Sequence, residues 1–112
     1  MAALSIDRLF DAAIRIQIME RSISLTFSEN IVRIRFPTTR RLAEFLEVPH
    51  YYILPYFAMM EEENLITRAE RVGIMTTLKG SQKVLTLMQE NYAVEMQEIL
   101  GPGVFSALTG KK

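Results

Sequence analysis

The sequence predicts an α+β fold, because short stretches of alternating apolar and polar residues lie between segments whose apolar residues recur at helical spacing. Apolar residues alternate with polar ones in 23–27 and 32–36, whereas those of 6–18 recur every three or four positions. From 38 to 80 the pattern reads as helix, turn, helix, two strands and the start of another helix. With 112 residues, 49% of them hydrophobic, the chain can bury one core, so we expect a single domain over 1–112.

The N-terminal part is predicted to form a helix followed by a hairpin. Ser5 is a suitable cap for a helix that continues to about Arg21. Two strands then follow within 22–36, joined by a turn at 28–30, and Pro37 ends the second strand. An alternative interpretation leaves 22–30 as a loop.

Two helices joined by a tight turn come next. Thr38 or Thr39 caps the first, over about 39–46, and Val48 begins the turn to a second helix over about 49–63. Pro55 lies inside this second helix, where a proline costs about 3 kcal/mol, so we expect a kink or a one-turn break there.

The remainder of the chain is predicted as a hairpin and one long helix. Strands over 65–68 and 73–76 are joined by a short tip at 69–72. Thr77 caps a helix over about 77–100, which the Gly101–Gly103 segment ends. We expect the last residues, 110–112, to be frayed.

Several motifs over 38–80 occur in one order and spacing. A helix with the pattern Leu-Ala-x-x-Leu is followed by a turn that contains a valine. The next helix has three apolar residues suited to the core. After its last turn an asparagine, at a position where glycine is common, precedes Leu-Ile. A Thr-Thr-x-x-Gly segment then opens the last helix. In order, these residues are Leu42, Ala43, Leu46, Val48, Ile53, Phe57, Met60, Glu61, Asn64, Leu65, Ile66, Thr76, Thr77 and Gly80. Glycine adopts the left-handed backbone conformation that ends a helix most easily, and asparagine is the next most tolerant residue.

In these motifs the chain resembles winged-helix transcription regulators of the MarR, ArsR and PadR kind. The resemblance implies a helix-turn-helix over about 38–64, a wing over about 65–76 and a C-terminal helix over about 77–100, with the first helix and hairpin as an N-terminal extension. It further implies a DNA-binding regulator that contacts double-stranded DNA through the second helix of the motif, the start of the first helix and the wing. The expected DNA-binding residues are Arg40, Arg41, His50, Tyr51, Tyr52, Tyr56, Arg68 and Arg71.

Arg40 and Arg41 also carry a physical argument of their own. Both lie in the first turn of a predicted helix, where the helix dipole disfavours a cation by roughly 0.3 to 1 kcal/mol. An anion such as a DNA phosphate docking at this end offsets that cost. The alternative is that these arginines are simply solvated surface residues, because short charge runs are usually solvated faces. The net charge of the chain is zero, which argues against binding nucleic acid through bulk electrostatics alone.

The outward face of the 49–63 helix favours a different partner. It carries Tyr51, Leu54 and Met59, and none of the Arg, Lys, Asn or Gln side chains that read base edges. Tyrosine and methionine are enriched in protein interfaces. The alternative function is therefore a winged-helix module that binds a protein through this face, unless the rest of the chain covers it.

An apolar stripe along the 77–100 helix suggests self-association. The stripe is longer than one small domain is expected to bury, which favours a homodimer built from the first and last helices. The alternative is that the helix wraps its own domain. The expected dimer-interface residues are Leu85, Met88, Tyr92, Met96 and Ile99.

Composition argues against catalysis, metals and membranes. The chain has no cysteine and a single histidine, and its three consecutive glutamates, Glu61 to Glu63, point in different directions. A glycine-rich phosphate loop is missing. Its longest apolar run, 51–60, is far shorter than a membrane span. We expect a cytoplasmic protein that is not an enzyme and uses neither a cofactor nor a metal.

Overall fold

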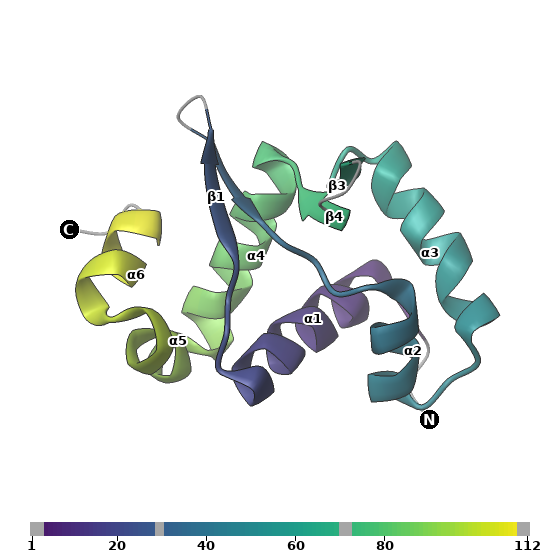
Figure 1. Cartoon of the computed structure of the whole chain (residues 1–112), viewed down its shortest axis with the longest axis horizontal. Helices are drawn as coiled ribbons and strands as arrows, with labels where there is room; N and C mark the ends of the chain where they lie inside the picture. The colour runs from purple at the N-terminus through teal and green to yellow at the C-terminus, as the bar shows by residue number, and fades with distance from the viewer. Residues whose placement is uncertain (1–3, 29–30, 70–72, 110–112) are drawn as a thin grey trace.

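A computed structural model describes residues 4–28, 31–69 and 73–109 of the chain. In these residues the fold is a mixed α+β arrangement of six helices and two antiparallel two-stranded sheets. Helix α1 crosses the middle of the molecule, with α2 and α3 on one side and α5 and α6 on the other (Figure 1). The elements are α1 (Ile6–Glu20), β1 (Leu25–Ser28), β2 (Ile31–Ile34), α2 (Thr39–Leu46), α3 (His50–Glu62), β3 (Ile66–Ala69), β4 (Gly73–Thr76), α4 (Leu78–Asn91), α5 (Ala93–Leu100) and α6 (Pro102–Thr109).

Helix α1 is the central element of the core. The Ser5 hydroxyl accepts a hydrogen bond from the Arg8 amide, which confirms the predicted cap. Apolar residues on several faces of α1 are buried, as expected of a helix surrounded by other elements. The buried apolar residues of α1 are Leu9, Phe10, Ala12, Ala13, Ile14 and Ile16.

The predicted N-terminal hairpin is confirmed, and the alternative of a loop over 22–30 is wrong. β1 and β2 pair antiparallel with Leu25 opposite Ile34 and Phe27 opposite Val32. The expected turn at 28–30 falls mostly outside the described residues. The hairpin is tied to α4 and to β4, because the Ser81 hydroxyl of α4 donates to the Val32 carbonyl and the Thr76 hydroxyl of β4 accepts from the Ile34 amide.

Helices α2 and α3 form as predicted, with one difference at Pro55. Thr38 caps α2 by accepting from the Arg41 amide, and Asn64 has a φ of 63° after α3, as its glycine-like position requires. The expected one-turn break at Pro55 does not occur, since α3 is continuous. Proline has no amide hydrogen, so the Tyr51 carbonyl lacks the helical donor that residue 55 would otherwise supply. Both residues are exposed, so water can donate to that carbonyl instead.

The second hairpin joins the segment that precedes α2. β3 and β4 pair with Ile66 opposite Thr76, and the tip expected at 69–72 lies largely outside the described residues. Arg35 bridges to Met75, and the Phe36 amide donates to the Ile74 carbonyl at 2.8 Å. The chain entering α2 is therefore bonded to β4, the second strand after α3.

The C-terminal prediction of one helix over 77–100 is wrong. Helix α4 ends at Asn91, α5 begins at Ala93, and a further helix, α6, follows Gly101. The Tyr92 hydroxyl donates to Asp11 Oδ1 and accepts from Arg15 Nε at 2.9 Å, so both partners lie on α1. This anchorage turns α5 back toward the core. Pro102 does stop α5, but it also starts α6, where the first helical position tolerates proline.

Gly80 allows α4 to begin directly against the backbone of Leu65, between α3 and β3. A Cβ atom at this position would lie 1.8 Å from the Leu65 carbonyl oxygen and 3.2 Å from the Thr76 Cβ. The neighbouring Thr77 fixes the contact, because its amide donates to the same Leu65 oxygen. Glycine is therefore required here by close packing.

We expect Gly80→Ala to destabilise the protein by about 1–3 kcal/mol, since the clash involves backbone that must shift. Gly103→Ala is the matched control, because no atom lies within 4 Å of its Cβ position. In a helix that change should be neutral or stabilising by up to about 1 kcal/mol. Urea unfolding measures both; equal stability of Gly80→Ala and wild type would contradict the packing argument.

A second prediction concerns the Tyr92 phenol. Burial raises its pKa, as does the hydrogen bond to Asp11, while the bond from Arg15 lowers it. A raised folded pKa means that the contribution to stability is complete below the unfolded pKa of about 10 and is lost as the pH rises through the folded value. Tyr92→Phe should cost about 1 kcal/mol at pH 7, with a smaller difference from wild type in alkali. Unfolding at both pH values tests this; a pH-independent difference would contradict it.

Candidate functional site

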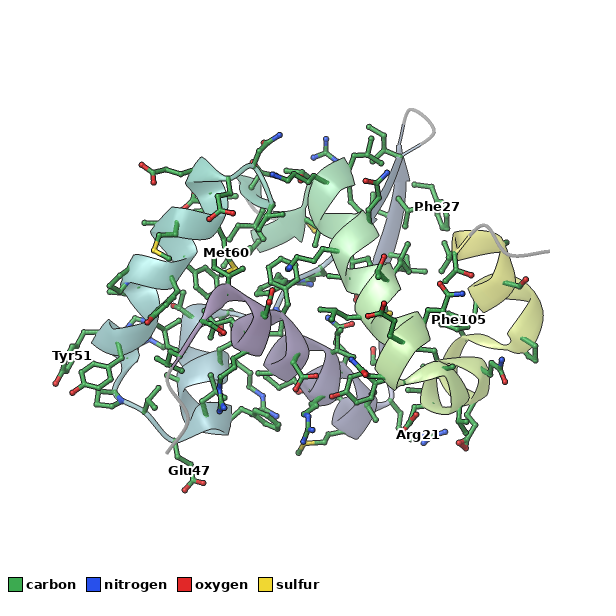
Figure 2. The ribbon with its side chains drawn as sticks, turned by 180° about the vertical axis from the view of Figure 1, so that it is seen from behind. Arg21, Phe27, Glu47, Tyr51, Met60 and Phe105 are labelled. Carbon is green, nitrogen blue, oxygen red and sulfur yellow. The ribbon has the colours of Figure 1, made fainter. Side chains whose placement is uncertain are left out.

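The outward face of α3 is the main exposed apolar surface among the predicted site residues. Ile53, Phe57 and Met60 point into the core and are fully buried, as predicted. On the opposite face Tyr51 is 66% exposed and Tyr52 51%. Tyr51 projects away from the molecule at the start of α3, whereas Met60 points toward its body (Figure 2). The interpretation in which the hairpin or the first helix covers this face is therefore wrong.

We refer to the exposed residues on the outward side of α3 as the α3 face. Its exposed apolar and aromatic members share helical spacing along the first ten residues of α3: Tyr51, Tyr52, Leu54, Pro55, Ala58 and Met59. The Tyr51 and Tyr52 rings pack edge to face with centroids 4.8 Å apart. This contact restrains two large side chains that would otherwise move freely in water.

The α3 face ends in acidic residues. Glu61, Glu62 and Glu63 are all exposed at the C-terminal end of the helix. Arg68 Nε lies 3.3 Å from Glu61 Oε1, and the Lys79 ammonium donates to the Glu63 carbonyl. Within the described residues the carboxylates of Glu62 and Glu63 have no ion-pair partner. One end of the face is thus aromatic and the other carries free negative charge.

The predicted basic residues do not form one free cationic surface. Arg40 is exposed and has no ion pair in the described part of the chain, but Arg41 Nε lies 3.4 Å from Glu20 Oε2. Arg68 is paired with Glu61, as above, and Arg71 lies outside the described residues. Of the predicted arginines that the structure describes, Arg40 is the one left unpaired.

His50 and Tyr56 do not belong to the exposed surface. His50 Nε2 lies 2.6 Å from the Thr39 hydroxyl oxygen, which links the first residue of α3 to the first residue of α2. Tyr56 is half-buried and packs against the core. Sequence spacing gives no signal for the Thr39–His50 contact or for Glu20–Arg41, because each joins residues on different helices.

The predicted dimer stripe faces the chain's own core. Leu85 is 8% exposed, Met88 1% and Met96 0%. Tyr92 is bonded to α1, and Ile99 is half-buried against the core. The surplus apolar surface that suggested a homodimer is therefore absent at these positions. Leu85 and Met88 face the core from α4 itself, and the break at Tyr92 allows α5 to place Met96 and Ile99 against the same core.

The described residues offer neither a membrane span nor a metal cluster. Among the helices of 4–109, none combines the length and the apolar composition that crossing a bilayer requires. No group of three or more potential metal-ligating side chains is found in the same described ranges.

The tyrosines of α3 are predicted to differ in their effect on stability. Tyr51→Ala should change the free energy of unfolding by less than about 1 kcal/mol, because the side chain is mostly in water. Tyr56→Ala should cost about 1–3 kcal/mol, a part of the 3–5 kcal/mol typical of a fully buried aromatic residue. Denaturant unfolding compares the two directly. A loss of several kcal/mol in Tyr51→Ala would show that Tyr51 is structural.

Comparison with known proteins gives no match: no family model fits the chain, and no curated protein or solved structure is significantly similar to it.

Proposed function

We propose that the chain is a winged-helix domain that binds a partner protein through the α3 face. The winged-helix assignment is supported by the order of α1, strand, α2, α3 and the β3–β4 hairpin. It is supported further by the Phe36–Ile74 hydrogen bond, which joins the strand segment before α2 to the hairpin after α3.

The observation that carries the proposal is the exposure of Tyr51, Tyr52, Leu54 and Met59 on one side of α3. A helix that inserts into the major groove of DNA reads base edges with hydrogen-bonding side chains, and α3 has no Arg, Lys, Asn or Gln. Tyrosine and methionine are instead enriched in protein interfaces, and tyrosine recurs among the residues that dominate binding energy.

The charge of the α3 face indicates the chemistry of the partner. Free carboxylates at Glu62 and Glu63 follow the aromatic and apolar residues along the same helix. A complementary segment carries apolar side chains over Tyr51 to Met59, followed by lysine or arginine. Such basic residues increase the association rate and fix the direction of docking.

Duplex DNA is the second candidate partner, and Arg40 is the observation that favours it. Its unpaired guanidinium lies in the first turn of α2, near the positive end of the helix dipole. The acidic end of α3 opposes this role, because carboxylates repel the phosphate backbone.

In the test, a photo-crosslinking amino acid replaces Tyr51 or Met59 in the full chain, which is produced in its native cells. Thr86, an exposed residue of α4, is the control position. We expect crosslinks to one protein from both α3 positions and none from Thr86. Peptide mapping should locate them in an apolar segment next to lysine or arginine. Leu54→Asp should abolish them, and high salt should leave most of the complex intact.

Duplex DNA binding of the purified chain is measured in parallel. Two results together would favour duplex DNA as the partner. The wild-type chain would bind DNA strongly, and Arg40→Ala would lower the slope of log affinity against log salt concentration by about 1. Tyr51 and Met59 crosslinks no stronger than those at Thr86 would contradict the protein-binding proposal.

A further inference from the structure

The outer edge of β1 has no strand beside it in the described part of the chain. β1 and β2 form a sheet of two strands, and β2 is the described element with which β1 makes extensive contact. Phe27 of β1 is 68% exposed and lies on the opposite side of the molecule from Tyr51 (Figure 2). The β1 edge is therefore a surface separate from the α3 face.

The inner edge of β1 is paired with β2. The Arg35 amide donates to the Ser24 carbonyl at 2.9 Å. Backbone groups of alternate residues point the same way in an antiparallel pair, so Ser24 and Thr26 direct their amides and carbonyls toward β2. Leu25 and Phe27 therefore direct theirs away from β2. Within the described residues these outward groups make no backbone hydrogen bond.

The outer edge of β2, in contrast, is already bonded. The Ile34 amide donates to the Thr76 hydroxyl, and the Val32 carbonyl accepts from the Ser81 hydroxyl. Both groups point away from β1, as the alternation along the hairpin requires. The hairpin can thus accept a further strand at one edge, that of β1.

The residues of this edge do not protect it from pairing. Native edge strands are commonly shielded by charged side chains or by proline. The segment 22–28, Ser-Ile-Ser-Leu-Thr-Phe-Ser, contains neither. It alternates between apolar and hydroxyl-bearing side chains, as a strand does. An exposed strand of this composition is a template for pairing with another strand.

The order of residues in the segment suits antiparallel pairing with itself. A two-fold axis at Leu25 sets this residue opposite its own copy. The same axis sets Ile23 opposite Phe27 of a second copy, and Ser24 opposite its Thr26. Pairs of a β-branched and an aromatic residue, and pairs of serine and threonine, are favourable across strands. A second copy therefore supplies a matching strand in a single defined register.

We propose that β1 pairs antiparallel with β1 of a second copy of this chain, which joins two hairpins into one four-stranded sheet. Leu25 exchanges both backbone hydrogen bonds with its own copy, and Ile23 exchanges them with Phe27 of the second copy. The contact is isologous and uses the one open edge of each hairpin. It therefore closes at two copies and does not extend into a fibre.

Cysteine crosslinking tests both the pairing and its register, because the chain has no cysteine of its own. Ser24→Cys and Thr26→Cys are mixed under reducing conditions and then oxidised. In the proposed register the two cysteines of a mixed dimer are directly opposed, with Cα atoms about 4.5 Å apart, which a disulfide can bridge. In a dimer of either variant alone they lie on a diagonal about 7–8 Å apart, which is too far.

We expect the mixture to form several times more disulfide-linked dimer than either variant alone. Equal yields in the three samples would overturn the proposal, because they would show collision without a defined register. This measurement leaves the core unchanged, since Ser24 and Thr26 are both exposed.

Sedimentation equilibrium of the full chain measures the association itself, from about 10 µM to about 1 mM, a range suited to a contact of small area. We expect a monomer–dimer equilibrium for the wild type. Phe27→Lys should weaken it at least about tenfold, because a charged side chain on an edge strand opposes pairing. Circular dichroism checks that this variant remains folded.

Leu54→Lys is the matched control, because it makes the same kind of change at a residue of the α3 face that is 44% exposed. Its dimerisation should equal that of the wild type. A wild-type monomer at every concentration would overturn the proposal, and so would equal weakening by Phe27→Lys and Leu54→Lys. None of these results decides the partner of the α3 face, which the photo-crosslinks from Tyr51 and Met59 identify.

Discussion

The ring of Phe36 packs edge-on against Phe10 of α1 at 5.2 Å and against Phe57 of α3 at 5.8 Å between ring centroids. Contacts of this geometry contribute about 0.5–1.5 kcal/mol each beyond the area they bury. The amide of the same residue donates to Ile74 of β4. Since Phe36 lies just before α2, one residue relates α1, α3 and the second hairpin to one another. The orientation of α3, and with it the exposure of its outer face, depends on this junction.

Helix α3 is apolar on nearly all sides, a pattern that ordinarily belongs to a helix buried within a larger protein. In this fold one side is packed on Phe36 and its neighbours while the other meets water. Contiguous exposed apolar side chains of this kind mark interaction sites in soluble proteins. One helix thus combines a fully buried Phe57 with a mostly exposed Tyr51, and the proposed function assigns recognition to the exposed side.

Local signals predicted the N-terminal two-thirds of the fold well. The caps at Ser5 and Thr38 and the left-handed Asn64 depend on neighbouring residues alone, so spacing and residue type were sufficient. At the break in the C-terminal helix, Tyr92 is bonded to Asp11, 81 positions away, and no local pattern reports such a contact.

The candidate site was predicted in part. Spacing identified which side of α3 faces outward, because Ile53 and Phe57 define the core side. Spacing could not show whether an apolar stripe packs within its own domain or against a second copy of the chain. For this reason it predicted Met88 and Met96 as dimer-interface residues, although both are buried in the core. Nor could it show that Arg41 and Arg68 have carboxylate partners on other elements.

The hydrogen bond from the Ile34 amide to the Thr76 hydroxyl joins residues 42 positions apart and encloses α2, α3 and β3 in one closed loop of chain. The loss of chain entropy on closing a loop of that length is incurred during folding. A partner that docks on α3 therefore meets a surface whose backbone is already ordered, and little of the binding free energy is spent on arranging it. Under the proposed function, α3 is in this sense preorganised by a hydrogen bond between two residues that lie outside it.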